Sequence, residues 1–225
     1  MSLSLNAPWM NLDLGAPMRV LSWAINRPGL VTARHIVWRE VRNADLPRDL
    51  DVIEWFANEL EATGRTDAVA FLTSRDLGYH NRTVATVDGV TARCTATTGL
   101  SNAERVGTRT DYSHRDWGTI NLCVALDIGL TDAALIEALS IAAQARTAAV
   151  MDAGLILPHG IATGTGTDCI AVAAPAGDCP YAGLHTPQGE ALGRAVYDAI
   201  HAGALDWHRQ YPQAKGLPLQ PETCP

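Results

Sequence analysis

Apolar and polar positions alternate along residues 119–127, and this two-residue period predicts a strand with one buried face. The apolar face of that strand is formed by Ile120, Leu122, Val124 and Leu126. Thr119 and Asn121 share the opposite face. Asn is depleted in strands, so strand propensity does not explain Asn121. The pattern therefore predicts a strand that carries polar side chains on one face near its start.

Further strands are predicted where short apolar or β-branched runs are bounded by turn residues. They cover residues 19–26, 68–73, 82–87, 90–97 and 167–174. An Asp-Gly pair at positions 88–89 separates the third from the fourth, and it favours a type I′ hairpin turn because both turn positions need positive φ. The last of the five is almost entirely apolar, which is typical of a strand covered on both faces.

Three helices are predicted, the first and third from helical periodicity and the second from its composition and cap residues. The first covers residues 47–63, with Pro47 in its first turn and Gly64 at its end. Its apolar face is formed by Leu50, Ile53, Ala57 and Leu60. The second, over residues 131–153, is rich in Ala and has Thr131 as its N-cap. The third begins at Thr186. Its apolar stripe consists of Leu192, Ala195, Val196, Ala199, Ile200 and Gly203.

The second helix lies between the strands at 119–127 and 167–174, and this β-α-β order makes the two strands parallel. Together with the hairpin, it predicts an α/β (α+β) fold: a single domain with a mixed sheet and helices packed on it. The domain is expected over residues 18–210. The Pro-rich, weakly periodic ends predict an N-terminal arm over residues 1–17 and a C-terminal tail over residues 211–225.

Three segments rich in Gly, Thr and Asn flank these strands, at residues 97–104, 118–121 and 162–168. The crossover puts the starts of its two strands at the same sheet edge. The first segment reaches that edge as well if the strand at 90–97 runs antiparallel. Polar loops that converge on a rigid sheet edge form a candidate binding site. The structural alternative is that Gly-Thr-Gly-Thr is only a tight turn and Asn102 only a turn residue.

Asp168 lies at the start of the apolar strand predicted over residues 167–174 and shares a face with Ile170 and Val172. A buried carboxylate is costly unless it is ion-paired, hydrogen-bonded or functional. We therefore expect it either to accept hydrogen bonds from neighbouring backbone or Thr donors or to have a pKa raised by desolvation.

Composition excludes several classes of function. The 225 residues are 47% hydrophobic and 18% charged, which is ordinary for a globular domain. The net charge is −7 and the basic residues are scattered, so no nucleic-acid partner is expected. Lys215 is the single lysine, which leaves no candidate for a Schiff-base lysine or a P-loop lysine.

The five cysteines show no C-x-x-C spacing, and the N-terminus has no signal-peptide pattern. No run of about 18 apolar residues is present, so we expect no membrane partner and a cytoplasmic location. Asp111, His114 and Asp116 fit a solvated polar loop better than a metal site. His201 and His208 are seven positions apart on one helix, about 10 Å along its axis, too far to bind one metal. No metal and no organic cofactor are therefore expected.

Six short motifs follow one another along residues 90–200. They are residues 98–103 with Arg105 and Gly107, residues 118–121, Leu130 with Thr131, Ala145 with residues 147–149, residues 162–168, and residues 181–183 with His185, Thr186, Gly189 and Gly193. In this order they resemble the adenosylcobinamide amidohydrolase (CbiZ) family of corrinoid-salvage enzymes, with weaker similarity back to about residue 20. The resemblance implies hydrolysis of the amide that joins aminopropanol to the corrin ring, giving adenosylcobyric acid. Cobalt would arrive only as part of this small-molecule substrate.

Amide hydrolysis needs an activated nucleophile or water, donors for the oxyanion and an acid for the leaving amine. Under the resemblance, Asp168 is predicted as the base and Thr119 as the nucleophile. Asn102 and Asn121 would polarise the carbonyl, and His185 would be the acid. Because corrinoids are fringed with amides, hydroxyl, amide and backbone groups suit their binding. The predicted substrate-binding set is Thr98, Gly99, Ser101, Thr165, Gly166, Thr167 and Gln144.

The chain departs from the family pattern at two places. Gln-Ala-Arg at 144–146 replaces an expected Glu-Ala-Lys, and Arg-Pro-Gly at 27–29 replaces an expected Gly-Gly. If the family's Glu is catalytic, this chain binds corrinoid without hydrolysing it. If that Glu pairs with the Lys, an amide and a guanidinium preserve the hydrogen bond. Two alternatives therefore stay open: a non-catalytic corrinoid carrier, and an amidase that cleaves itself before Thr119 to expose an α-amino base. Assembly into a homo-oligomer is also left open.

Overall fold

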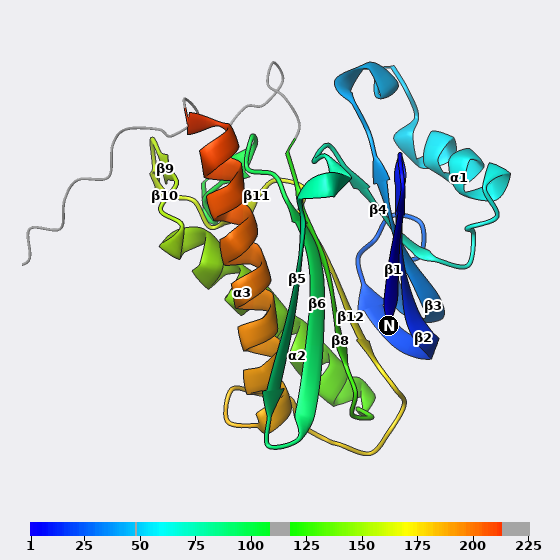
Figure 1. The fold of residues 1–225 in the computed structure, drawn as a ribbon, viewed down its shortest axis with the longest axis vertical. Helices are drawn as coiled ribbons and strands as arrows, with labels where there is room; N and C mark the ends of the chain where they lie inside the picture. Colours follow the sequence, from blue (N-terminus) through cyan, green and yellow to red (C-terminus); the bar gives the residue numbers. More distant parts are fainter. Residues whose placement is uncertain (48, 109–117, 213–225) are drawn as a thin grey trace, which may run out of the picture.

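The computed structural model describes residues 1–47, 49–108 and 118–212 (Figure 1). Within them lies an eight-stranded mixed sheet in the order β4-β3-β2-β12-β8-β6-β5, with β1 paired to β2. Its strands are β1 (Ser2–Asn6), β2 (Trp9–Ser22), β3 (Gly29–Glu40), β4 (Val69–Thr73), β5 (His80–Val87), β6 (Val90–Thr98), β8 (Ile120–Leu126) and β12 (Cys169–Ala174). The helices are α1 (Val52–Ala62), α2 (Asp132–Asp152) and α3 (Pro187–Gln210). The predicted single-domain mixed α/β fold is confirmed.

Several short elements connect these. Two 3-10 helices cover Asn43–Asp45 and Leu77–Tyr79. The two-residue strands β7 (Ala103–Glu104) and β11 (Gly164–Thr165) pair with each other. A second small pair is formed by β9 (Ile156–Leu157) and β10 (Gly160–Ile161).

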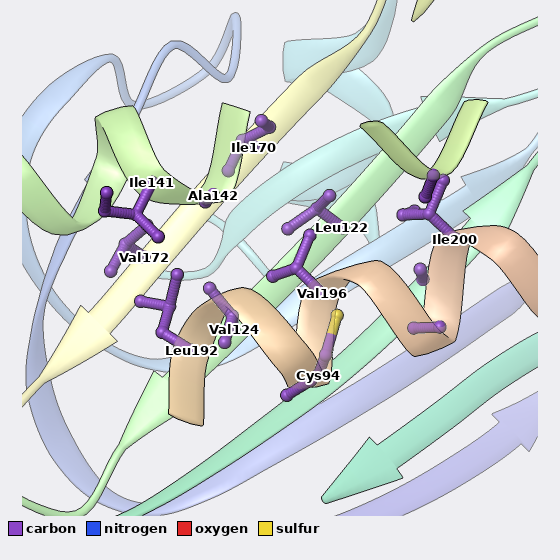
Figure 2. Close-up of a cluster of buried hydrophobic side chains, with 14 of the residues drawn as sticks. Cys94, Leu122, Val124, Ile141, Ala142, Ile170, Val172, Leu192, Val196 and Ile200 are labelled. Carbon is purple, nitrogen blue, oxygen red and sulfur yellow. The ribbon is translucent and has the colours of Figure 1, made fainter. Parts of the chain in front are cut away.

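Helices α2 and α3 cover one face of the sheet and form the larger core (Figures 1 and 2). Figure 2 shows Leu122 and Val124 of β8 facing side chains from both helices. The apolar row predicted for β8 lies in this core, and so does the stripe predicted for α3. Small Ala side chains on α2 allow the helix to approach the sheet closely. The apolar stripe that predicted α3 therefore packs in this core, and the Ala-rich α2 packs beside it.

A second core fills the opposite face of β8 and β12. Strands β2, β3 and β4 contribute Met10, Leu12, Trp38 and Phe71 to it, and β8 contributes Cys123. Trp38 Nε1 donates to the backbone oxygen of Asn121 at 3.4 Å. The far end of the sheet therefore folds back over the central strands, while α1 packs on its outer surface through Phe56 and Leu60.

The predicted crossover and hairpin are both confirmed. β12 runs parallel to β8, with Cys169 opposite Asn121, and β6 runs antiparallel to β8, with Thr97 opposite Asn121. Asp88 and Gly89 have φ of 47° and 84°, as the type I′ turn between β5 and β6 requires. The starts of β8 and β12 and the end of β6 therefore lie at one sheet edge.

The prediction of an arm over residues 1–17 is wrong, because this segment forms β1 and most of β2. Met10, Leu12 and Leu14 are buried at alternate positions. Pro8 lies in the turn between the two strands, and Pro17 lies where the register with β3 shifts. Prolines at a turn and at an irregularity do not interrupt the hydrogen-bond ladder, so they were poor evidence against strands. The strand predicted over residues 19–26 likewise ends at Ser22.

The first helix begins at Val52, later than predicted. Asp51 is its N-cap, and the side chain of Asp51 accepts from the backbone N–H groups of Ile53 and Glu54. The predicted face is wrong in part: Ile53 is 66% exposed, whereas Leu60 is buried as predicted, together with Phe56.

Among the helices in the described ranges, α2 could cross a membrane as judged by its length and composition alone. The core helices of soluble proteins pass the same test. Its buried side chains include Leu135, Ile141 and Val150, which lie in the core shared with the sheet and α3. The predicted tail lies outside the described residues beyond position 212.

Candidate functional site

A cavity of about 240 Å³ lies where β8 and β12 begin and β4 ends. Its apolar wall is formed by Ala24, Ile25, Val41, Leu46, Ala70, Phe71, Leu72 and Cys169. Its polar side chains are those of Ser74, Thr119, Asn121 and Thr167, and Gly118 completes the lining. The cavity is therefore an apolar pocket with a few polar groups at the sheet edge, which is a common form of small-molecule site.

The three polar loops meet at this edge, as predicted. Gly99 N donates to Thr119 O at 2.9 Å, and the Thr119 hydroxyl donates to Thr167 O at 2.9 Å. Asn102 Nδ2 donates to the Thr167 hydroxyl at 3.4 Å. A Cβ on Gly118 would lie 2.6 Å from Ser101 N, so only glycine allows the first two loops to pack this closely. Each loop therefore touches both of the others.

Asp168 lies beneath the cavity on the side of the sheet that α2 covers. Its carboxylate forms an ion pair with Arg146 of α2 and accepts from the Thr165 hydroxyl. It also accepts from Thr165 N at 3.0 Å and from Ile120 N at 3.1 Å. Burial raises the pKa of Asp168, while Arg146 and the hydrogen bonds from Thr165 and Ile120 act in the opposite direction.

These contacts tie Asp168 into a hydrogen-bonded network. Four donors surround its two oxygens, which leaves little capacity to accept a proton from a reacting group. Its contacts join α2, the start of β8 and the turn that carries Thr167. A Cβ on Gly164 would collide with Arg146 Nη1 and lie 2.6 Å from Asp168 Oδ2, which explains the glycine at this point of the turn. The expectation that Asp168 must be paired is confirmed, whereas the geometry does not support its predicted role as a base.

The family model described as adenosylcobinamide amidohydrolase (CbiZ) matches residues 2–212. The chain belongs to the adenosylcobinamide amidohydrolase family. The resemblance inferred from the motifs is thus confirmed, and it extends across the N-terminal strands.

One curated relative in this family is the adenosylcobinamide amidohydrolase of Halobacterium salinarum. It is 34% identical over 166 aligned positions, and the match covers 66% of this chain and 65% of that protein. Among solved structures, a crystal structure of a Pyrococcus horikoshii OT3 protein matches 88% of this chain and 77% of its own, at 10% identity and a TM-score of 0.43. The sequence match identifies the family, and the structural match adds no argument about function.

Most of the residues predicted for an amidohydrolase site do cluster. Thr119, Asn121 and Thr167 line the cavity. Asn121 Nδ2 donates to Leu72 O at 2.6 Å, which fixes the amide against β4. Asn102 is buried behind the cavity, and its Oδ1 has no hydrogen-bond partner among the residues described.

The remaining predicted binding residues lie around this cluster. The Thr165 hydroxyl donates to the carboxylate of Asp168, and Gly166 N donates to Asn102 O at 3.4 Å. Gly99 and Ser101 line a second cavity next to the first.

Three predicted site residues lie elsewhere. His185 is exposed in the segment before α3, at the other end of the sheet (Figure 1). In that segment Ala182 N donates a hydrogen bond to the side chain of Glu137 on α2. Glu137 is nine residues, or about 13 Å along the helix, from Arg146, which lies at the site. Thr98 faces α3, where a Cβ on Gly203 would lie 2.6 Å from its hydroxyl. Gln144 is exposed on α2. The placement of His185, Thr98 and Gln144 in one site is therefore wrong.

Sequence reasoning missed the residues that shape the site from other elements. Arg146, the ion-pair partner of Asp168, was noticed only as a departure from the family pattern. Cys169 was implied, because it is the next residue after Asp168 and must face the opposite side of the strand. No signal in the sequence pointed to Ile25 or Phe71, because the loop after β2 and the strand β4 reach the cavity only through the folding of the sheet.

No group of three or more His, Cys, Asp or Glu residues in the described ranges could hold a metal ion. Asp111, His114 and Asp116 lie outside those ranges. His201 stacks on the ring of Tyr197, with 5.5 Å between the ring centroids. The expectation of a site without a resident metal stays a prediction.

Cys169 lines the cavity, and its chemistry can be tested directly. Burial raises the pKa of its thiol to about 12, so the thiol stays protonated at neutral pH and is a poor nucleophile. We expect iodoacetamide at pH 7.5 to leave Cys169 unmodified in the folded protein and to alkylate it in urea. Peptide mass spectrometry measures both, with buried Cys94 as the matched control. Rapid labelling of Cys169 alone in folded protein would contradict this and would make it a candidate nucleophile.

Proposed function

We propose that this protein hydrolyses the amide that joins aminopropanol to the corrin ring of adenosylcobinamide, giving adenosylcobyric acid in corrinoid salvage. Membership of the family supports the reaction type, and the Halobacterium salinarum relative carries the same name. The observation on which the proposal rests is the cavity at the sheet edge, with Thr119, Asn121 and Thr167 in its wall.

The size of the cavity decides which part of the substrate enters it. At about 240 Å³ it falls below the range of roughly 300–1,000 Å³ that holds a whole drug-sized ligand. A corrin ring is larger than such a ligand, so the ring has to stay at the mouth while its amide-bearing arm enters. Trp23 and Ile25, which are 44% and 48% exposed, lie at the end of β2 beside the cavity and offer an apolar surface to the ring.

The polar groups in the wall suggest how the amide reacts. The Thr119 hydroxyl is the candidate nucleophile, because it is a hydroxyl in the cavity wall and lies beside the Asn121 amide, 3.4 Å from Asn121 Oδ1. Asn121 Nδ2 donates one hydrogen to Leu72 O, and its second hydrogen is available to the carbonyl of the substrate amide. Asp168 holds the Thr167 turn and the start of β8 in register through Arg146 and Ile120. In this assignment the hydroxyl oxygen attacks the amide carbon, its proton passes through solvent to the leaving amine nitrogen as the C–N bond breaks, and water then hydrolyses the resulting ester. It replaces the base and acid roles first predicted for Asp168 and His185.

The geometry gives no support to the non-catalytic carrier. That alternative rested on Gln144 replacing a Glu, but Gln144 is exposed on α2, and Arg146 is paired with Asp168 instead. The proposal keeps the remaining predictions: cobalt only within the substrate, no resident cofactor, a cytoplasmic location, no nucleic-acid or membrane partner, and an open oligomeric state.

Incubation with adenosylcobinamide tests the proposal. We expect equimolar release of aminopropanol and adenosylcobyric acid, followed by chromatography and mass spectrometry, and no release by a Thr119→Val variant of the same fold. Stoichiometric retention of unmodified, coloured corrinoid on a sizing column would instead favour a carrier. If the protein neither binds nor cleaves adenosylcobinamide, the assignment of a corrinoid substrate to this chain is wrong.

A further inference from the structure

A second cavity, of about 360 Å³, adjoins the first, and Val41 and Ser74 line both. Gly99 and Ser101 form part of its wall, so it borders the same polar loops. The end of α3 contributes Trp207, and Arg75, which follows β4, contributes a buried cation. The two cavities are therefore neighbouring compartments of one edge of the fold.

Arg75 is only 4% exposed, yet its hydrogen bonding is incomplete. Nη1 donates to Gln210 Oε1 at 2.8 Å, and the guanidinium lies over the ring of Tyr79 at 4.7 Å. Nε and Nη2 are buried and have no hydrogen-bond partner anywhere in residues 1–47, 49–108 and 118–212. A buried, unpaired donor on a charged group is costly, which makes this an unusual arrangement to keep without a ligand.

The nearby carboxylates are held by other groups. Asp206 pairs with Arg209 and accepts from Asn81 Nδ2 at 3.2 Å. Asp76 accepts from Gly78 N at 2.7 Å, and Glu40 accepts from Leu77 N at 3.2 Å. Asp206 and Asp76 favour the charged form of Arg75 through space, while burial lowers its pKa. The cation thus has compensating charge around it but no acceptor on two of its nitrogens.

The identity of those two nitrogens points to the ligand. Nε and Nη2 lie along one edge of the planar guanidinium and donate in parallel, which matches two oxygens of a carboxylate or a phosphate. We propose that the cavity beside Arg75 binds an oxyanion through a side-on, two-bond contact with this arginine. Stacking on Tyr79 and the hydrogen bond to Gln210 fix the guanidinium. The two parallel donors, Nε and Nη2, therefore form a fork that is oriented before the ligand binds.

The position of this cavity suggests where the oxyanion comes from, and this step rests on the proposed function. An arm whose amide lies beside Thr119 can continue past Val41 and Ser74 toward Arg75. A phosphate on the hydroxyl of the aminopropanol arm would then reach the fork. The second source is free inorganic phosphate, which offers the same oxygens without the arm.

Calorimetric titration with inorganic phosphate, at ionic strength held constant with chloride, tests the site without any substrate. We expect saturable 1:1 binding, weakened about tenfold or more by Arg75→Lys, which keeps the charge but removes the fork. Arg75→Gln should act in the same direction. Arg194→Gln, at an exposed arginine on α3, is the control for net charge and should leave binding unchanged. Absence of saturable binding, or equal binding by Arg75→Lys, overturns the proposal.

Two substrates then distinguish the sources. If the arm supplies the oxyanion, kcat/KM for adenosylcobinamide phosphorylated on its arm exceeds that for the neutral arm, and Arg75→Lys abolishes the difference. Equal kcat/KM for both, with phosphate still bound through Arg75, assigns the site to the free anion. Phosphate binding through Arg75 without cleavage of either substrate would sink the proposed function and leave the oxyanion site standing.

Discussion

Replacing Asp168 with Asn is expected to destabilise the fold by about 3–5 kcal/mol, because it leaves the Arg146 guanidinium buried without its counter-charge. For a chain of this length the melting temperature should fall by about 10 °C or more. The amide keeps the shape of the carboxylate but cannot accept from all of its present donors, which include Thr165 and Ile120. The melting temperature, by calorimetry, and the turnover per folded molecule should be measured on the same preparation.

The two measurements separate a positioning role from a catalytic one. If Asp168 only positions the Thr167 turn, the folded fraction of Asp168→Asn keeps turnover within about tenfold of wild type. A general base would lose on the order of a hundredfold or more with stability nearly unchanged. Arg146→Met combined with Asp168→Asn is the matched control. Removing both partners should cost less than the sum of the two single changes, and strict additivity would contradict the ion pair.

The central part of the fold follows from local pattern. The alternation in β8, the small-residue helix α2 and the apolar strand β12 specify a right-handed crossover with few alternatives, and the Asp-Gly turn specifies the hairpin. The convergence of the three polar loops then follows from topology. The fold-back of β2, β3 and β4 over Cys123 does not, because the alternation within each strand does not specify which distant strand its buried face will contact.

The candidate site shows the same division. Thr119, Asn121 and Thr167 were predictable because each lies at a strand start on the shared edge. His185 was misplaced although the crossover itself argues against it: β12 begins at the site, so the chain that follows β12 leaves from the opposite edge. The burial of Asp168 implied a partner, but nothing in the sequence named Arg146, which is 22 positions away on another element. The rotation of α2 about its own axis, relative to β12, decides that Arg146 is the side chain facing Asp168.

Replacing Thr119 with Val is expected to reduce kcat by on the order of a hundredfold or more, because it removes the proposed nucleophile with little change in shape. The variant also leaves Thr167 O without its 2.9 Å donor, which should cost about 1–3 kcal/mol of stability. Turnover is therefore compared per folded molecule, with KM measured separately. Thr119→Ser keeps a hydroxyl at the same register and should retain activity within about tenfold of wild type.

Intact-mass measurement on the same preparations tests the mode of activation of Thr119. A nucleophile that acts through its side chain alone works in the uncut 225-residue chain, so active wild-type protein should show only the full-length mass. Self-cleavage before Thr119 would instead yield two fragments in the active wild type and none in Thr119→Val. Near-normal kcat in uncut Thr119→Val would contradict both modes. The hydroxyl would then serve only to hold Thr167 and β8 together at the mouth of the cavity.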